Sequence, residues 1–459
     1  MSGIQRIFSI AERALLAQQT AMNVVSSNIS NAQNPKYSRQ RPHFSDDTAT
    51  RVNNFFLGMG ARVESIQRTR DRIYDSKIWQ ENGAFGHLDK GQKYIKMTEP
   101  VFTDFAGSGL SGLLDDFWNG WNELANHPEN PAVRASLRGK ANQLTDRLNE
   151  MDSQLRSLAN QAVQELGQDI DKVNQLTREI AKLNQHVQRN RTTNGLDNST
   201  QERRDALVDA LSKYVDVTAS FHDDGTVTLS ASGHVLVDKA VAFDFSLKTE
   251  NVAGESRASL TLYGSRAVEL RSGSLKSLVD WANSNTSDKR KHLDEIAQML
   301  VEQVNSVHAE LYTLGGDTGI DFFDPAGATA GSIKLSQSVL SDLANIAVSE
   351  NGQRGDGAGA LQIDSIRDAK VLNNGTSTID EMYRSVVSMV GQEGSEIQTK
   401  LETQTDVVNM LETQRQSIMG VSLEEEMVSL IQYQNAFEAA SKVIQTADEM
   451  MQTIINMVG

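Results

Sequence analysis

The chain has 459 residues, with 44 Lys and Arg against 60 Asp and Glu, and it contains no cysteine. This length is enough for about two to four domains, and a hydrophobic content of 39% is ordinary for a globular protein. The net charge of −16 disfavours a general phosphate-binding surface, so nucleic acid is not an expected partner. The lack of cysteine excludes disulfides, thiolate metal sites and a cysteine nucleophile.

No apolar run approaches the roughly 20 residues that a transmembrane helix needs. Arg6, Glu12 and Arg13 also lie where a signal peptide would place its apolar core. Composition alone therefore predicts a cytoplasmic protein that does not insert into membranes.

The N-terminal segment predicts a thin amphipathic helix with an abrupt end. Its apolar residues recur at about 3.6-residue spacing, with Gln18 filling one step, at Ile4, Phe8, Ala11, Leu15, Met22, Val25 and Ile29. The stripe then runs into an Asn-rich turn around Pro35 and a cationic exit ending at Arg41. Because tertiary packing supplies most helical stability, such a helix needs a partner.

A long helix is predicted in the middle of the chain, where residues 132–324 contain no proline. From Leu137 to Val187 almost every step between apolar residues is three or four, which indicates one rod-like helix or two helices end to end. Asn130 is the expected N-cap and Pro131 the expected first helical residue.

The period changes to alternation after residue 214. The segment VDVTASFHDDGTVTLSASGHVLVD predicts a hairpin that turns at Asp224-Gly225, with a third strand following. Strand-like sequence continues to about residue 270, which indicates a small antiparallel β module. Helical periodicity returns from Leu275, before a Gly- and Asp-rich loop and a mixed segment to about residue 372.

A second heptad-like helix is predicted at the C-terminal end. Its apolar and small positions, interrupted by Gln434, are Leu430, Phe437, Ala440, Ile444, Ala447, Met451, Ile454 and Val458. Residues 1–72 hold ten Lys and Arg against five Asp and Glu, whereas residues 401–459 hold two against nine. The two terminal helices are therefore expected to pair, and because a two-helix pair leaves apolar surface exposed, the protein is expected to bind copies of itself.

The predicted fold is mainly α with inserted β, in a discontinuous multi-domain chain. Residues 1–40 and 415–459 are expected to form a terminal domain of paired, coiled-coil-like helices. Residues 41–213 and 271–414 are expected to form a rod-like helical-bundle domain with mixed segments. Residues 214–270 are expected to form a small antiparallel outer module.

No motif in the sequence specifies a cofactor, a metal or a catalytic site. GSGLSG at residues 107–112 lacks the Gly-Lys-Ser/Thr ending of a phosphate-binding loop and is interpreted as a flexible turn. Asp317, Asp321 and Asp324 do not have the spacing of an EF-hand loop and are interpreted as a solvated turn.

Two further groups of polar residues receive structural interpretations. His292 and His308 match no catalytic arrangement and are interpreted as polar-face or capping residues. The segment Leu423–Glu426 is interpreted as anionic residues that stabilise a helix N-terminus, with Ser422 as the N-cap.

The stretch NISNAQNPKYSRQRP resembles the signature shared by flagellar rod, hook and hook-associated proteins. Further stretches make the chain most similar to the hook-associated members of the hook-filament junction: WNELANHPENPAVRASL, STQERRDALVDALSKYVDV with DDGTVTLSASGHVLVD, VNSVHAELYTLGGDTGIDFF and GVSLEEEMVSLIQYQNAFEAASKVIQTADEMMQTIINM. Two departures are Lys36, where the family usually has Gly, and a shorter chain, which implies a reduced or absent outer variable domain.

The resemblance implies a structural axial protein, not an enzyme, that flagellar type III export secretes without a cleaved signal. It replaces the cytoplasmic prediction with an extracellular location at the hook-filament junction. It further implies a ring of identical subunits, contacts with the hook protein and with the second hook-associated protein, and an export chaperone on the C-terminal helix. In the family the paired terminal helices form the innermost, channel-lining domain.

The expected mechanism is folding of the terminal helices coupled to assembly, because burial of their stripes against neighbouring subunits drives ordering. The expected interface residues are Leu15, Met22, Val25 and Ile29 on the first helix, and Leu430, Phe437, Ile444, Met451 and Ile454 on the last. Asn28, Asn31, Pro35, Tyr37 and Arg39 are expected to fix the exit from the first helix.

Three alternatives remain open from the sequence. The chain could be a hook or rod subunit, which shares the terminal signature. It could be a cytoplasmic coiled-coil scaffold, which secretion into the medium would distinguish. It could also be a hydrolase that uses Asp223 and Asp224 as paired carboxylates, although both residues are better explained as turn formers.

Overall fold

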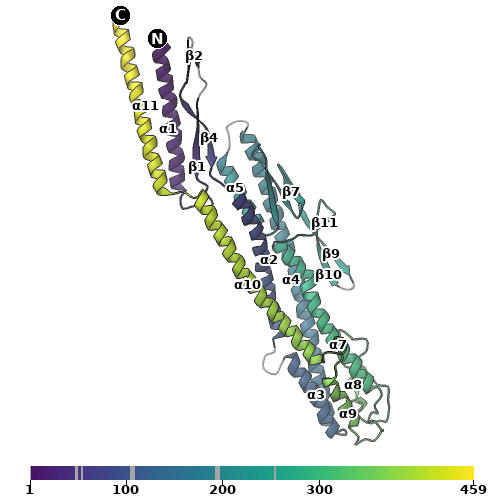
Figure 1. Ribbon diagram of the computed structural model, residues 1–459. Coiled ribbons are helices and arrows are strands. Elements are labelled where there is room, and N and C mark those ends of the chain that lie inside the picture. The colour runs from purple at the N-terminus through teal and green to yellow at the C-terminus, as the bar shows by residue number, and fades with distance from the viewer. Residues whose placement is uncertain are drawn as a thin grey trace.

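The computed structural model describes residues 2–46, 50–52, 55–103, 109–191, 197–252 and 255–458. The molecule is elongated and bent, and both chain ends lie at the same tip (Figure 1). A terminal arm and a longer rod meet at an elbow, where α10 gives way to α11. The predicted mainly α fold with small antiparallel sheets is confirmed.

The terminal arm consists of α1 (Ser2–Ser30), α11 (Leu423–Val458) and a β extension. The two helices run side by side in opposite directions, as Figure 1 shows. The predicted pairing of the first and last helices is therefore confirmed. The extension pairs β1 (Gln40–Asp46) with β4 (Ala61–Arg68), and both strands contact α1. It continues into β2 (Thr50–Val52) and β3 (Phe55–Leu57).

The strands of this extension were not predicted from the sequence. Their register shifts between His43 and Phe44, and Pro42 within β1 has no backbone N–H to donate to the neighbouring strand. An irregular hairpin of this kind lacks a clean alternation, so no strand signal stands out in the sequence.

The rod is built on four long helices that lie lengthwise: α2 (Arg72–Phe102), α4 (Pro131–Arg191), α7 (Thr286–His308) and α10 (Ile379–Met419). The predicted long helix is a single element of 61 residues. Its repeat buries Leu137, Leu144, Leu148, Met151 and Leu155 completely. Asn130 Oδ1 accepts the Ala132 N–H at 3.0 Å, which confirms the predicted N-cap.

The β region lies along α4, on the side away from α10 (Figure 1). It follows α5 (Asn198–Leu211) and contains two antiparallel sheets. The first orders β5 (Val217–Phe221), β6 (Val227–Ala231), β7 (His234–Asp238) and β8 (Val241–Ala242). The second orders β11 (Arg266–Val268), β10 (Glu255–Leu262) and β9 (Phe245–Val252).

The predicted turn at Asp224-Gly225 is confirmed. Gly225 has a φ of 82°, a left-handed conformation that favours glycine. Asp224 Oδ1 accepts the Thr226 N–H at 3.0 Å, as expected of a turn-forming aspartate. These contacts favour the turn interpretation over a catalytic pair of carboxylates.

The rod's far end is closed by short helices around an aromatic cluster. These helices are α3 (Leu110–Asn126), α8 (Gln337–Ser341), α9 (Ala358–Asp364) and two 3₁₀ turns (Leu343–Asn345 and Ser365–Asp368). α6 (Ser274–Asp280) and a π-helix (Trp281–Asn285) lie instead between the β region and α7, where they contact α2 and α4. Phe117, Trp121 and Phe322 pack edge to face or tilted against one another. The start of the GSGLSG segment, residues 107–108, lies outside the described residues.

The interpretation of His308 as a polar-face or capping residue was wrong, because its side chain is completely buried beside this cluster. Its Nδ1 lies 2.6 Å from the Ile320 carbonyl, and its Nε2 accepts the Ala347 N–H at 2.8 Å. Burial lowers the pKa of His308 to about 4, although the hydrogen bond to Ile320 opposes this shift. The ring is therefore a neutral structural bridge inside the rod.

Candidate assembly interface

The shared face of α1 and α11 is centred on small side chains. Ala17 and Ala21 on α1, and Ala440 and Ala447 on α11, are all buried. Small residues allow the helix axes to approach closely, while larger apolar side chains spread over the flanks of the contact. The arm therefore has a narrow seam rather than a thick core.

The predicted apolar interface residues occupy graded positions around this seam. Val25 is buried, and the half-buried positions are Leu15, Met22, Ile29, Leu430, Phe437, Ile444 and Met451. Ile454 differs, because 39% of its side chain is exposed. Pairing of the two helices alone thus leaves most of the predicted stripe incompletely covered.

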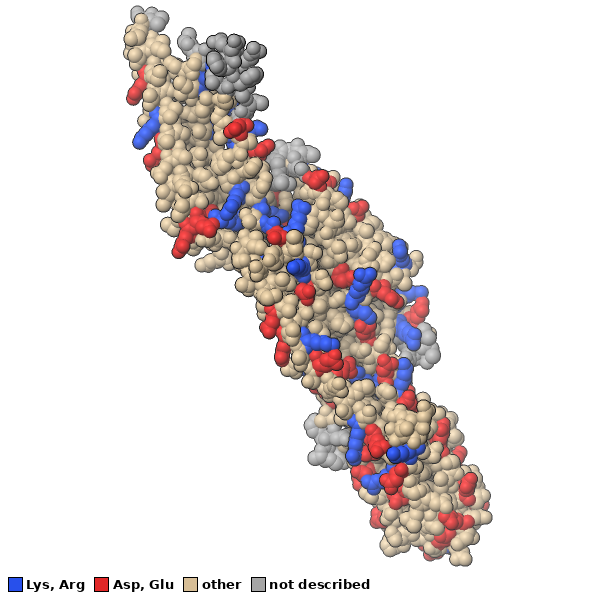
Figure 2. Space-filling model, in the orientation of Figure 1, with Lys and Arg blue, Asp and Glu red and all other residues tan. Residues whose placement is uncertain are grey.

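An exposed apolar row on α11 was only partly predicted from the sequence, which indicated Ile454 but not Val443, Met450 or Met457. Val443, Met450, Ile454 and Met457 follow one another at steps of seven, four and three, and are 39–81% exposed. We name these four residues the outer stripe. Figure 2 shows few charged side chains on the visible outer part of the arm. Exposed apolar rows of this kind mark protein-protein contacts.

The base of the arm is held by a buried polar network of Asn28, Tyr37, Arg39 and Glu426, which we name the arm network. Asn28 Nδ2 donates to Glu426 Oε2 at 2.9 Å, and Arg39 Nε donates to Glu426 Oε1 at 2.7 Å. Tyr37 donates its hydroxyl proton to Asn28 Oδ1 at 2.9 Å. Asn28 and Glu426 are 1% and 2% exposed, so the network joins α1, the exit loop and α11 in a dry environment.

The exit loop is also tied to the rod. The Arg39 N–H donates to the Met419 carbonyl at 2.8 Å, and the Ser38 N–H donates to Glu202 Oε1 at 2.8 Å. Burial raises the pKa of Tyr37, as do the carboxylates of Glu202 and Glu426, while a hydrogen bond with Ser27 opposes the rise. Tyr37 therefore stays a neutral hydrogen-bond donor at physiological pH.

Glu426 is the central residue that sequence reasoning missed. The interpretation of Leu423–Glu426 as the acidic first turn of a helix holds, because α11 begins at Leu423 and Ser422 Oγ accepts the Glu425 N–H at 3.5 Å. It is incomplete, because Glu426 is buried and paired with Arg39 while Glu425 bonds Arg39 at 2.5 Å. The charge asymmetry between the two chain ends was the available signal.

The remaining predicted exit residues lie outside the network. Asn31 is half-buried and its side chain donates to the Ser27 carbonyl at 2.8 Å. Pro35 and Lys36 are exposed and line a cavity of about 1110 Å³ between the arm and the rod. Lys36 is not among the described residues with positive φ, so the turn after Pro35 does not require the glycine that the family usually has.

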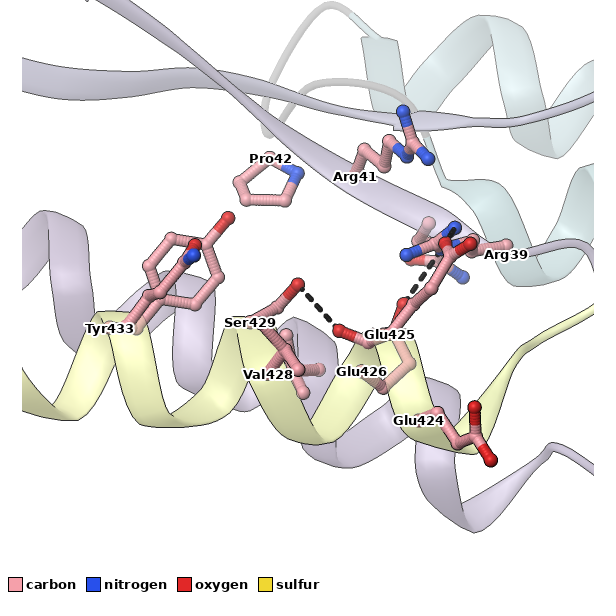
Figure 3. A pocket seen from close by; sticks show the side chains of 12 residues that line it. Arg39, Arg41, Pro42, Glu424, Glu425, Glu426, Val428, Ser429 and Tyr433 are labelled. Carbon is pink, nitrogen blue, oxygen red and sulfur yellow. Dashed lines mark hydrogen bonds and ion pairs between the residues drawn. The ribbon is translucent and has the colours of Figure 1, made fainter.

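A groove of about 560 Å³ lies between β1 and the first turns of α11, next to the arm network. Figure 3 shows Arg41 and Glu424 on opposite sides of it, with Val428 and Tyr433 along α11. Both charged side chains are exposed, whereas Arg39 and Glu426 behind them are paired. The groove combines apolar walls with charged edges, which suits contact with another polypeptide.

Within the part of the chain that the structure describes, no group of three or more His, Cys, Asp or Glu side chains is arranged to hold a metal ion. This includes the loop with Asp317, Asp321 and Asp324, where Asp324 pairs with Lys334 at 3.1 Å. None of the described helices is long and apolar enough to cross a membrane.

Comparison with family models matches three segments of the chain. Residues 95–323 match the helical domain of the flagellar hook-associated protein FlgK. Residues 8–34 match the flagella basal body rod protein family, and residues 417–457 match the C-terminal family of flagellar basal body rod FlgEFG proteins. The last two matches coincide with α1 and α11, the helices of the arm.

Relatives match almost the full length. Flagellar hook-associated protein 1 of Bacillus subtilis is 29% identical, over 98% of this chain and 97% of the relative. The protein of the same name from Salmonella typhimurium is 24% identical, over 97% and 99%. The solved structure of the flagellar hook junction protein FlgK from Burkholderia pseudomallei matches this chain with a TM-score of 0.67. The match covers 75% of this chain and 100% of that chain. At 13% identity, this likeness supports the fold alone. The chain belongs to the family of flagellar hook-associated protein 1, whose members are structural components of the bacterial flagellum.

Proposed function

We propose that this chain is exported and forms a ring at the junction between the flagellar hook and the filament. The α1 and α11 pair would form the inner, channel-lining layer, the rod an intermediate layer, and residues 214–270 the outer module. Full-length similarity to proteins named hook-associated protein 1 supports this location over that of a hook or rod subunit.

The observation that carries the proposal is the outer stripe. Val443, Met450, Ile454 and Met457 are exposed along a helix that is already paired. Contact with a neighbouring subunit would remove this apolar surface from water, at roughly 25 cal/mol per Å² buried. Because the seam between α1 and α11 is narrow, we infer that the arm opens readily in the free subunit and becomes fully ordered only in the ring.

The same apolar surface suggests which partner would cover the arm at each stage. Before export, a dedicated chaperone on α11 would cover the apolar rows. After export, copies of the chain would cover them, while the hook protein and the second hook-associated protein would contact the ring on its two sides.

A substitution on the outer stripe tests this function. In cells that lack the native gene, Met450→Glu is expected to abolish filament attachment, because docking would bury the new carboxylate without a partner. Gln452→Glu is the matched control, since position 452 is exposed on a different face of α11 and receives the same side chain. Filaments are counted by electron microscopy and the secreted protein is measured in the medium. Normal filaments with Met450→Glu would contradict the proposal.

A further inference from the structure

A separate cavity of about 210 Å³ lies on the rod, close to the elbow. It is bordered by the end of β4, the start of α2, α5 and the turn between β5 and β6. Four arginines line it, Arg68, Arg70, Arg72 and Arg204, together with two aspartates, Asp75 and Asp205. Its lining therefore carries an excess of positive charge in a protein whose net charge is −16.

The two aspartates are shared among more cations than they can neutralise. Asp205 lies 3.0 Å from Arg68, 3.1 Å from Arg70 and 3.0 Å from Arg204. Burial alone would raise the pKa of Asp205, but the three guanidinium groups lower it below its ordinary value. Arg70 also donates two hydrogen bonds to the carboxylate of Asp75, from Nε at 2.6 Å and from Nη2 at 3.0 Å. Arg72 lies over the ring of Phe221, with its guanidinium carbon 4.5 Å from the ring centroid.

Carboxylates near the cavity are engaged elsewhere. Glu202 accepts the Ser38 N–H of the exit loop, and Asp209 accepts the Trp79 indole N–H at 2.6 Å and pairs with Arg415 at 3.0 Å. They moderate the local field, but no hydrogen bond joins either of them to the side chains of the lining described above.

Two buried donors on the lining have no hydrogen-bond partner among the described residues. They are Nη1 of Arg68, whose side chain is only 10% exposed, and Nε2 of Gln201. The two side chains already touch, since Arg68 Nη2 donates to Gln201 Oε1 at 2.9 Å. An unsatisfied buried donor costs about 1–3 kcal/mol, and more where the group is charged, so a missing acceptor is expected at this point.

We propose that this cavity binds a small oxyanion of the phosphate or sulfate class. Guanidinium groups present paired N–H donors that match the oxygens of such ions. The cavity volume of about 210 Å³ is several times the roughly 30 Å³ that one water molecule occupies in the liquid, so a tetrahedral oxyanion has room in it. Because the lining comes from β4, α2, α5 and the β5–β6 turn, a bound anion would cross-link the root of the arm to the rod and to the β region.

Inorganic phosphate is the probe, added to the purified full-length protein with potassium chloride at the same ionic strength as the reference. We expect saturable broadening of the ³¹P resonance of phosphate, and a rise in the rod's unfolding midpoint of about 2 °C or more over chloride at a concentration well above Kd. Sulfate should raise the unfolding midpoint as phosphate does, and acetate should raise it less, because the proposed ligand is a tetrahedral oxyanion and not a carboxylate.

The decisive variant is Gln201→Glu, which retains the acceptor for Arg68 and replaces the unpartnered amide with a negative charge. It is expected to fold, to melt no lower than the parent protein in chloride, and to lose both responses to phosphate. Gln161→Glu on the exposed face of α4 makes the same chemical change away from the cavity and should keep both. Equal midpoints of the parent protein in phosphate and chloride, or a full phosphate response in Gln201→Glu, would overturn the proposal.

Discussion

The rod and the terminal arm are both made of long amphipathic helices, yet they bury their apolar residues to different extents. In the rod, Leu137, Leu144 and Leu148 of α4 are 0% exposed, because neighbouring elements cover the helix on several sides. In the arm, Ile444 is only half-buried and Met450 is 48% exposed. The rod therefore covers its long helix within one chain, whereas the arm presents apolar surface that no described residue of the chain covers.

The two regions also use buried charge differently. In the rod, Lys90, Lys93 and Tyr94 donate to Glu165. Burial alone would raise the pKa of Glu165, but these hydrogen bonds outweigh burial and lower it to about 2. This cluster sits on the flank of a large apolar core. In the arm, Glu426 and Arg39 belong to the small arm network at the base of a narrow seam, with no large apolar core beside them among the described residues. We infer that the orientation of the arm depends on a few polar contacts.

The largest effect is therefore expected from breaking the arm network. Arg39→Ala leaves Glu426 buried without its cation, and loss of one partner of a buried pair destabilises by about 3–5 kcal/mol. The loss should fall on the arm alone, so protease should cleave α1 and α11 faster than in the parent protein, and filament attachment should fail. The melting midpoint of the rod should stay unchanged.

Arg41→Ala is the control for this experiment, since Arg41 is exposed at the rim of the neighbouring groove. It should change the cleavage rate of the arm little, because exposed charges contribute about 0–1 kcal/mol. Equal protease resistance in the Arg39→Ala variant and the parent protein would show that the network does not hold the arm.

Periodicity was sufficient to predict the elements with long regular repeats. It identified the helix from Pro131, the alternation around Asp224 and the pairing of the terminal helices, because each depends on a local pattern repeated many times. It could not place Glu426 opposite Arg39, since these residues are 387 positions apart and only the tertiary fold brings them together. His308 was misread for the same reason, because its two partners, at positions 320 and 347, lie in irregular loops.

A smaller effect is expected in the rod from the titration of His308. The folded-state pKa of about 4 lies below the ordinary value of about 6.5, so the unfolded chain binds the proton first. The contribution of His308 is then fully present above pH 6.5 and is lost progressively as pH falls toward 4, up to about 3 kcal/mol. His308→Gln keeps a donor and an acceptor but does not titrate. The free energy of unfolding should therefore depend less steeply on pH over this window, by the equivalent of up to one bound proton.

Denaturant unfolding of the rod between pH 7 and 4 measures this slope. His292→Gln is the matched control, because it makes the same change at a partly exposed position, beside Glu295 at 3.5 Å, away from the His308 cluster. Identical pH profiles for His308→Gln and the parent protein would show that His308 does not titrate differently in the two states.

The smallest effect on the free subunit is expected from Ile444→Asp. Position 444 lies on the half-buried side of α11, where a carboxylate would meet α1 and, in the proposed ring, neighbouring copies. If the arm opens readily in the free subunit, this change should leave the main melting transition within a degree or two of the parent protein, since a loss of about 1 kcal/mol shifts a domain of this size by roughly 2–4 °C. Assembly and chaperone binding should nevertheless fail, because both would bury the new charge. A much lower midpoint would make the arm part of the stable core, and normal filaments would leave Ile444 without a role in assembly.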